Sequence, residues 1–335
     1  MTELLAAAVL GQPLWMWLAF GALVILLLTL DLGVLHRDQH EIGVRESLLL
    51  SGGYLALGVG FGAWVWSELG REAGLEYVTG FLVEKSLALD NVFVIATIFA
   101  AFAVPRAYQH RVLFWGVLGV IVLRGIMIGF GAALVARFAW ALWVFAAFLL
   151  VMGVKMFLSH EAPRDPHASP VYRWLAGHIR LTPRFHGHRF FVKQPGRDGR
   201  LVWFATPLFM ALVMVELADV VFAVDSVPAI FSITDEPYIV YTSNIFAILG
   251  LRALYFALAA MIARFAYLKQ ALAALLVFIG GKVFFAEAMG WEKFPAPLSL
   301  AITVILLAGG LGWSLWKTRP PRVPKLDRPG ASDGS

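Results

Sequence analysis

Apolar runs of about 20 residues recur along the whole chain, and each is long enough to cross the hydrocarbon core of a bilayer as a helix. Of the 335 residues, 60% are hydrophobic and only 15% are charged, whereas a soluble domain carries about 25% charged residues. In lipid the backbone must satisfy its own hydrogen bonds, so such runs fold as helices. The sequence therefore predicts an all-α polytopic membrane protein.

We expect nine spanning helices in a transmembrane domain of residues 1–317, followed by a disordered cytoplasmic tail at 318–335. The helices are expected at about 13–35, 47–67, 79–103, 111–135, 138–158, 203–231, 238–262, 270–289 and 297–316. A polar loop at 159–202 separates the fifth helix from the sixth. Its two β-prone runs, around a Pro–Gly and an Asp–Gly pair, predict a small cytoplasmic β-hairpin.

The basic residues are distributed unequally between the two sides of this topology. Alternate loops and the C-terminal tail hold 19 of the 27 Lys and Arg residues when Arg111 is counted with its loop, and the remaining loops hold 3. Cytoplasmic loops are the ones enriched in Lys and Arg. The chain is therefore predicted to lie in a bacterial inner membrane with its N-terminus outside and its C-terminus in the cytoplasm. The pI near 9.5 reflects these loops and does not indicate nucleic-acid binding.

Cysteine is absent, which excludes disulfides, zinc–thiolate sites and thiol redox centres. All eight histidines fall in loops or at helix ends. Inside the membrane only oxygen ligands and an occasional Met thioether remain. No haem-ligating pair and no nucleotide-binding fingerprint is found, so we expect neither an enzyme nor a permanently bound cofactor.

Two of the apolar segments, 82–99 and 214–231, are rich in charged residues. These are Glu84, Lys85 and Asp90 in the first segment, and Glu216, Asp219 and Asp225 in the second. A charge in hydrocarbon costs at least a few kcal/mol, so such residues are usually functional or paired. We interpret the two segments as the halves of a cation pathway.

An internal repeat relates these segments to each other. Glu84 aligns with Asp219 at an offset of 135, Arg124 with Arg252 at 128, and Lys155 with Lys282 at 127. Helices 3–5 and 6–8 therefore form two copies of one unit. Three helices per unit place the copies in opposite orientations, which is the inverted-repeat design of many secondary transporters with a substrate site near the membrane midplane.

Helical periodicity places some of the polar residues on common faces. Glu84 and Asn91 share one face of the first segment, and Glu216, Asp219 and Ser226 share one face of the second. Asp90 and Asp225 lie on other faces and would reach the same cavity only if the helix is unwound or kinked, and Pro228 predicts a kink in the second copy. Carboxylate, amide and hydroxyl oxygens suit Mn²⁺, Mg²⁺ or Ca²⁺ better than Zn²⁺ or Cu⁺.

An alternative is that the buried charges form structural salt bridges. The acids are Asp31, Glu84, Asp90, Glu216, Asp219 and Asp225, and the bases are Lys85, Arg124, Lys155, Arg252 and Lys282. Their numbers nearly cancel, and buried charges are usually paired because unpaired ones are costly. We expect the bases to act as structural or gating counter-ions around an acidic site.

The charged segments resemble the TerC family of integral membrane proteins. The similar stretches are EKSLALDNVFV, VELADVVFAVDSVPAIFSIT and PYIVYTSNIFAILGLRALYF, and the resemblance is closest to the Alx-like branch. The family is named for tellurium resistance, is grouped with the LysE-type exporters and is associated with Mn²⁺ efflux. The resemblance implies a metal site formed by Glu84, Asp90, Asn91, Glu216, Asp219, Asp225 and Ser226.

Two hypotheses of function follow. The first is an exporter of a divalent cation, Mn²⁺ by preference, that works by alternating access and exchanges the metal for protons. The second is a non-transporting membrane scaffold that helps exported proteins insert, fold or acquire metal, with protein partners on the loop at 159–202. A scaffold should tolerate Asp90→Asn, whereas a transporter should not.

Overall fold

The computed structural model describes residues 8–33, 44–138, 140–158, 166–195, 200–259, 268–291 and 293–318. Helices account for nearly all of the regular structure. The elements in chain order are β1 Ala8–Val9, β2 Gln12–Pro13, α2 Leu14–Gly33, α3 Val44–Leu69, α4 Arg71–Ala101, α5 Arg106–Arg137, α6 Ala141–Leu158, η1 Pro166–Ala168, α7 Pro170–His178, β3 Phe191–Pro195, β4 Leu201–Ala205, α8 Pro207–Phe231, α9 Pro237–Ile248, α10 Leu251–Ala259, α11 Leu268–Ala288 and α12 Ala296–Lys317. The expected tail lies beyond the described residues, apart from Thr318.

The described residues contain seven helices that are long and apolar enough to cross a membrane: α3, α5, α6, α8, α9 joined with α10, α11 and α12. The apolar part of α2 is a shorter segment, Leu14–Leu30. Helix α4 is 31 residues long but carries the charged residues of the first acidic segment. All nine expected runs are therefore helical in the described part of the chain, as an all-α polytopic protein requires.

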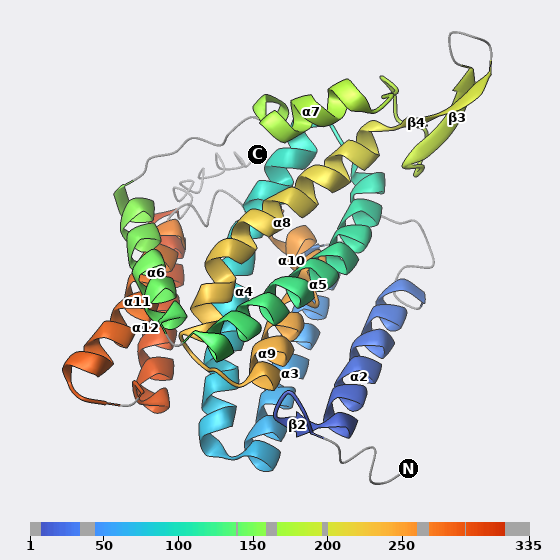
Figure 1. Ribbon diagram of the computed structural model, residues 1–335. Helices are drawn as coiled ribbons and strands as arrows, with labels where there is room; N and C mark the ends of the chain where they lie inside the picture. Colours follow the sequence, from blue (N-terminus) through green and yellow to red (C-terminus); the bar gives the residue numbers. More distant parts are fainter. Residues whose placement is uncertain are drawn as a thin grey trace, which may run out of the picture.

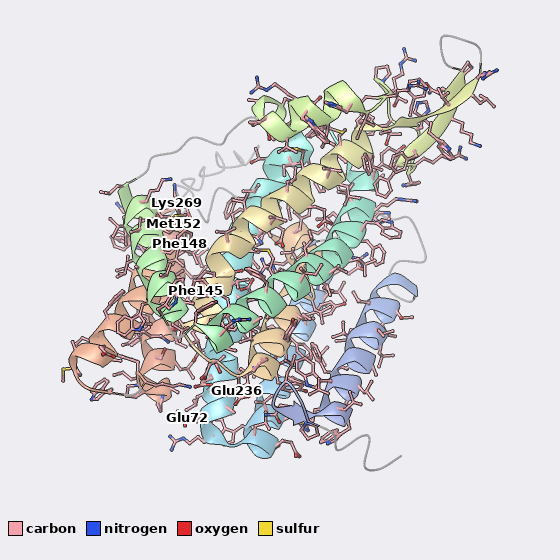
Figure 2. The ribbon with its side chains drawn as sticks, in the orientation of Figure 1. Glu72, Phe145, Phe148, Met152, Glu236 and Lys269 are labelled. Carbon is pink, nitrogen blue, oxygen red and sulfur yellow. The ribbon has the colours of Figure 1, made fainter. Side chains whose placement is uncertain are left out.

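Successive helices place their connections at opposite ends of the bundle (Figure 1). Helix α7 and the β3–β4 hairpin lie at one end, while the β1–β2 ribbon and the connection from α11 to α12 lie at the other. Glu72 and Glu236 lie at the end with the β1–β2 ribbon, and Lys269 lies at the opposite end (Figure 2). The acidic and basic connections are thus separated in space as the charge count predicts.

The helices of the two predicted repeat units pack in reciprocal pairs. Helix α5 packs against α8 and α9 packs against α4, while α6 packs against α11. If α4 is exchanged with α8, α5 with α9 and α6 with α11, the α5–α8 contact becomes the α9–α4 contact, and the α6–α11 contact maps onto itself. Figure 1 shows α6, α11 and α12 grouped at one side of the bundle, with α2 and α3 at the other side.

The contact between α6 and α11 shows this reciprocity at atomic scale. An added Cβ at Gly153 would lie 2.9 Å from the Ala273 carbonyl oxygen, and one at Gly280 would lie 2.6 Å from the Ala146 carbonyl oxygen. The offset of 127 that aligns Lys155 with Lys282 also aligns Gly153 with Gly280 and Ala146 with Ala273. Small residues let two membrane helices approach closely. The same close contact is therefore made twice, once from each unit.

Three helix boundaries differ from the expected ones. Helix α4 begins at Arg71 rather than near 79, and α5 begins at Arg106 rather than near 111. Helix α8 begins at Pro207 rather than near 203, because residues 201–205 form strand β4. The hairpin itself is confirmed, with Phe191 paired to Ala205 and Pro195 to Leu201. Helix α7 was not expected, since its nine residues are too few to give a periodic signal.

Pro228, at which the sequence predicts a kink, does not end α8. Helix α8 continues through this residue to Phe231, because a proline this close to the helix end removes only one hydrogen bond of the final turns. The predicted helix at 238–262 is the one that breaks, between α9 and α10. Gly250 there has a φ of +82° and an added Cβ would lie 2.7 Å from the Tyr54 ring, so glycine suits this position both in its backbone conformation and in its size.

The α6–α11 contact generates a test of the packing. Gly280→Ala should destabilise the protein by about 1–3 kcal/mol, the usual cost of overpacking, since the new methyl group would meet backbone atoms of Ala146 and Leu150. The neighbouring Gly281→Ala is the matched control, because its Cβ would make only an ordinary contact and alanine is the better helix former by about 1 kcal/mol. Thermal unfolding in detergent measures both, and equal midpoints would contradict the close contact.

Candidate functional site

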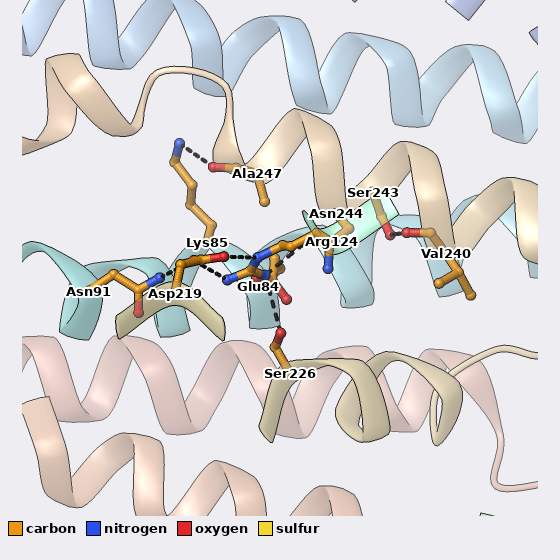
Figure 3. Close-up of polar contacts among 10 residues, drawn as sticks. All are labelled: Glu84, Lys85, Asn91, Arg124, Asp219, Ser226, Val240, Ser243, Asn244 and Ala247. Carbon is orange, nitrogen blue, oxygen red and sulfur yellow. Dashed lines mark hydrogen bonds and ion pairs between the residues drawn. The ribbon is translucent and has the colours of Figure 1, made fainter. Parts of the chain in front are cut away.

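A single buried arginine lies where the helices of the two units meet. Arg124 projects from α5, has a side chain that is 1% exposed, and is surrounded by polar side chains of α4, α8 and α9 (Figure 3). An arginine does not lose its proton in proteins, so a charge buried this completely needs acceptors on all sides. The neighbouring helices supply them.

The guanidinium of Arg124 binds two carboxylates. Its Nε donates to Asp219 Oδ2 at 3.2 Å and its Nη2 to Asp219 Oδ1 at 3.0 Å, which is a bidentate pair. Its Nη1 donates to the carboxylate of Glu84, and also to Ser226 Oγ at 3.1 Å and Asn244 Oδ1 at 3.4 Å. We call these five residues the Arg124 centre. Part of the salt-bridge alternative is therefore correct: Arg124 is a counter-ion for two of the buried acids.

Four of the seven predicted metal-site residues come together here: Glu84, Asn91, Asp219 and Ser226. Asn91 Nδ2 donates to Asp219 Oδ1 at 3.4 Å. Glu216 does not contact Arg124; its carboxylate lies beside Gly119 of α5, where an added Cβ would overlap it, and its Oε2 has no hydrogen-bond partner among the described residues. The side chains of Asp90 and Asp225 lie outside the described part of the structure.

Two of the other predicted counter-ions, Lys85 and Lys282, donate to uncharged oxygens. Lys85 Nζ donates to the carbonyl oxygen of Ala247, and Lys282 Nζ donates to Ser299 Oγ, at 3.0 and 3.1 Å. Arg252 is buried on α10. Lys155 is exposed, so the expectation that it is buried is wrong; its alignment with Lys282 fixed its place along the helix but not the face on which it lies.

A small cavity adjoins the Arg124 centre. Its volume is about 20 Å³, and its polar lining consists of Asn91 and Asp219. Asn91 Oδ1 accepts no hydrogen bond from any described residue and Asn91 is only 4% exposed. A buried polar atom without a partner is costly and calls for an unseen one, and the cavity has room for a single water-sized species. An amide oxygen beside a carboxylate favours a positively charged occupant.

Among the described side chains, no group of three His, Cys, Asp or Glu residues comes together to hold a metal ion. A cation in the small cavity would therefore have to take amide or hydroxyl oxygens together with Asp219. Calcium and manganese accept such mixed oxygen ligands. The donor set fits a hard divalent cation, with fewer carboxylates than the sequence predicts.

A larger cavity of about 330 Å³ lies at the end with the β1–β2 ribbon and shares no lining residue with the small one. Its walls include Glu76, Lys282 and the surface pair Asp235–Lys293. Burial would raise the pKa of Asp235, but the Lys293 ammonium 2.6 Å away outweighs burial and holds this pKa below its ordinary value. Both side chains are more than half exposed, and such pairs contribute about 0–1 kcal/mol.

Sequence reasoning missed Asn244 and Gly119. Asn244 follows Thr242 and Ser243 in an otherwise apolar helix, and such a polar cluster is the signal that could have found it. Gly119 gives no signal, because its role is to leave room for the Glu216 side chain.

Removing the central arginine should be far more damaging than removing an exposed charge. Arg124→Leu leaves Glu84 and Asp219 without a counter-ion, and breaking a buried pair in this way costs about 3–5 kcal/mol. Lys293→Gln breaks the exposed pair with Asp235 and should cost about 0–1 kcal/mol. Thermal unfolding of the purified variants provides the comparison. An Arg124→Leu variant as stable as Lys293→Gln would show that the two carboxylates do not depend on Arg124.

Comparison with known proteins places the chain in a family. The model of the integral membrane protein TerC family matches residues 69–322, a range that contains the whole Arg124 centre. The "Uncharacterized membrane protein STKORF319" of Myxococcus xanthus is 46% identical over 319 residues, which are 95% of this chain and 97% of that protein. The "Putative membrane-bound redox modulator Alx" of Escherichia coli K12 is 44% identical over 306 residues, which are 89% of this chain and 92% of that protein. No solved structure matches the chain. The chain is a multi-pass integral membrane protein and belongs to the TerC family.

Proposed function

We propose that this protein exports a divalent metal cation, Mn²⁺ by preference, across a bacterial inner membrane. The observation that carries this proposal is the unpaired Asn91 Oδ1, which lies beside the Asp219 carboxylate at the small cavity. The two residues come from α4 and α8, the corresponding first helices of the two repeat units. Inverted-repeat transporters bind their substrates at such a junction.

The formal charge of the Arg124 centre favours a cation. Two carboxylates, Glu84 and Asp219, face one guanidinium, which leaves one negative charge uncompensated when both acids are ionised. In a low-dielectric interior such a charge attracts a cation more strongly than it would in water. A divalent ion that binds Asp219 competes with Arg124 for the same oxygens, so we infer that Arg124 closes the site when no metal is bound.

The energy source would be an ion gradient. The sequence contains no ATP-binding signature, and carboxylates that release a metal can take up protons, so we infer exchange of the metal for protons. The charge distribution supports an N-terminus outside and a C-terminus in the cytoplasm. Export would then carry metal from the end with α7 and the hairpin to the end with the β1–β2 ribbon.

The name of the Escherichia coli relative refers to redox modulation. This chain contains no cysteine, so thiol chemistry cannot supply a redox activity here. A change in the concentration of a redox-active transition metal would link transport to redox state. We therefore propose that any redox effect of this protein is a consequence of metal export.

A scaffold function is the second candidate, and one surface favours it. Helix α7 and the hairpin expose Trp174 and Trp203, with 60% and 61% of their surfaces accessible. The described parts of residues 166–206 contain no acidic residue, whereas their exposed basic residues are Arg173, Arg180, Arg184, Arg189, Lys193 and Arg200. A basic surface with exposed aromatic residues suits an acidic protein partner.

Mn²⁺ flux into proteoliposomes tests the transport proposal. The wild-type protein should move Mn²⁺, and Asp219→Asn and Asn91→Ala should each lower the initial rate about tenfold or more, the effect typical of residues around metal sites. Asp90→Asn should also lose flux if that residue joins the pathway. Asp235→Asn is the matched control, because it removes an exposed carboxylate outside the centre, and its flux should equal that of the wild type.

Reconstitution into liposomes must be shown to be equal for all four variants. If the wild type moves no Mn²⁺ over a range of pH and metal gradients, the transport proposal fails and the scaffold becomes the better candidate. If transport occurs but Asp219→Asn and Asn91→Ala retain it, the pathway lies elsewhere in the protein.

A further inference from the structure

The chain leaves helical geometry between α9 and α10 within a predicted spanning segment. Helix α9 ends at Ile248, Leu249 has an extended conformation (φ −55°, ψ 130°), and Gly250 has a φ of +82° before α10 begins at Leu251. The last carbonyl groups of a helix have no partner within it, and in the hydrocarbon region water is not available to replace that partner. The oxygens at this break therefore need donors from elsewhere in the protein.

Lys85 provides those donors. Its Nζ donates to the carbonyl oxygen of Ala247 at 3.0 Å and to that of Leu249 at 3.3 Å, and Figure 3 shows the side chain extending from α4 to Ala247. The salt bridges between described residues do not include Lys85. The C-terminal end of a helix carries a partial negative charge, so this position favours a cation.

The internal repeat supplies a comparison within the same molecule. The offset of 135 aligns Lys85 with Val220 of α8, and the offset of 128 aligns Leu249 and Gly250 with Ile121 and Val122 of α5. Helix α8 packs against α5 as α4 packs against α9, yet α5 is continuous from Arg106 to Arg137. The helix that carries the lysine packs against the broken helix of the other unit, and the helix that carries the valine packs against the unbroken one.

Lys85 is also placed next to the Arg124 centre. Glu84, the preceding residue, binds Arg124, and Arg124 donates to Asn244, which lies three residues before Ala247 on α9. Adjacent residues of α4 thus hold the end of α9 in two ways. One contact passes through Arg124 to a side chain, and the other is made directly to backbone oxygens.

We propose that the Lys85 ammonium is a tethered cation occupying a backbone-carbonyl site at the α9–α10 break, and that this broken conformation is stable only while a cation with N–H donors fills the site. The corresponding ligand class is a primary alkylammonium ion. A free ion of this class can enter only when the lysine side chain has been shortened.

Chemical rescue tests the proposal on the purified full-length protein in detergent. Lys85→Ala removes three carbons and the amine, which n-propylammonium replaces. We expect Lys85→Ala to unfold at least about 2–4 °C below the wild type, a readily measured shift for a protein of this size. Millimolar n-propylammonium should raise the Tm of Lys85→Ala, because a ligand that binds only the folded state stabilises it.

Two controls separate the carbonyl site from general ion effects. Tetramethylammonium at equal concentration has the charge but no N–H donor, so it should leave the Tm of Lys85→Ala unchanged. Lys155→Ala, which shortens an exposed lysine, should not respond to n-propylammonium. If n-propylammonium raises the Tm of Lys85→Ala no more than tetramethylammonium does, the proposal is wrong.

If Lys85→Ala does not fold, a second pair of variants tests the proposal. Lys85→Met keeps most of the length without the charge, and Lys85→Arg keeps the charge and the donors. Yield of folded protein and Tm should be near wild type for Lys85→Arg and lower for Lys85→Met; equal values for the two would overturn the proposal. None of these measurements uses Mn²⁺, so their failure is distinct from a failure of the transport proposal.

Discussion

The buried ion pairs of Arg124 are the interaction on which the arrangement of the central helices depends. A lone guanidinium or carboxylate at this depth would cost several kcal/mol, so none of Arg124, Glu84 and Asp219 can be buried without the others. They belong to α5, α4 and α8, and Asn244 adds α9. The charges therefore fix the relative positions of four helices, two from each repeat unit, where apolar packing between membrane helices would allow many alternatives.

The repeat gives the fold its symmetry, and the departures from that symmetry are concentrated near the Arg124 centre. The α6–α11 contact is reciprocal down to individual backbone atoms. By contrast, Asn91 aligns with Ser226, Lys85 aligns with Val220, and only the second unit has a broken helix. A perfectly symmetric pathway would make the same contacts with a cation from both sides of the membrane. Unequal ligands at equivalent positions allow the cation affinity to differ between the two sides, which the proposed export can use.

Helical period and charge pattern were enough to predict the spanning runs, the repeat, and the shared faces of Glu84 with Asn91 and of Asp219 with Ser226. These features depend on residues close together in sequence. The contribution of Asn244 and the exposure of Lys155 depend on how helices are rotated against each other, which a single helix does not determine. A kink was predicted at Pro228 because proline lacks an N–H, whereas the break at Gly250 was not predicted, because it depends on the close approach of Tyr54 from another helix.

The positions of Glu84 and Lys85 suggest how cation loading and helix movement are connected. In the proposed transport cycle, a divalent ion at Asp219 would weaken the hold of Arg124 on Asp219, and through Arg124 it would weaken the link to Asn244 on α9. Lys85 would keep its hydrogen bonds to the end of α9 during this change, because its acceptors are the backbone oxygens of Ala247 and Leu249, which lie outside the Arg124 centre. With that end held and Gly250 next to it, the residues at 249–250 can act as a hinge, so that α10 moves while α4 and α9 stay together.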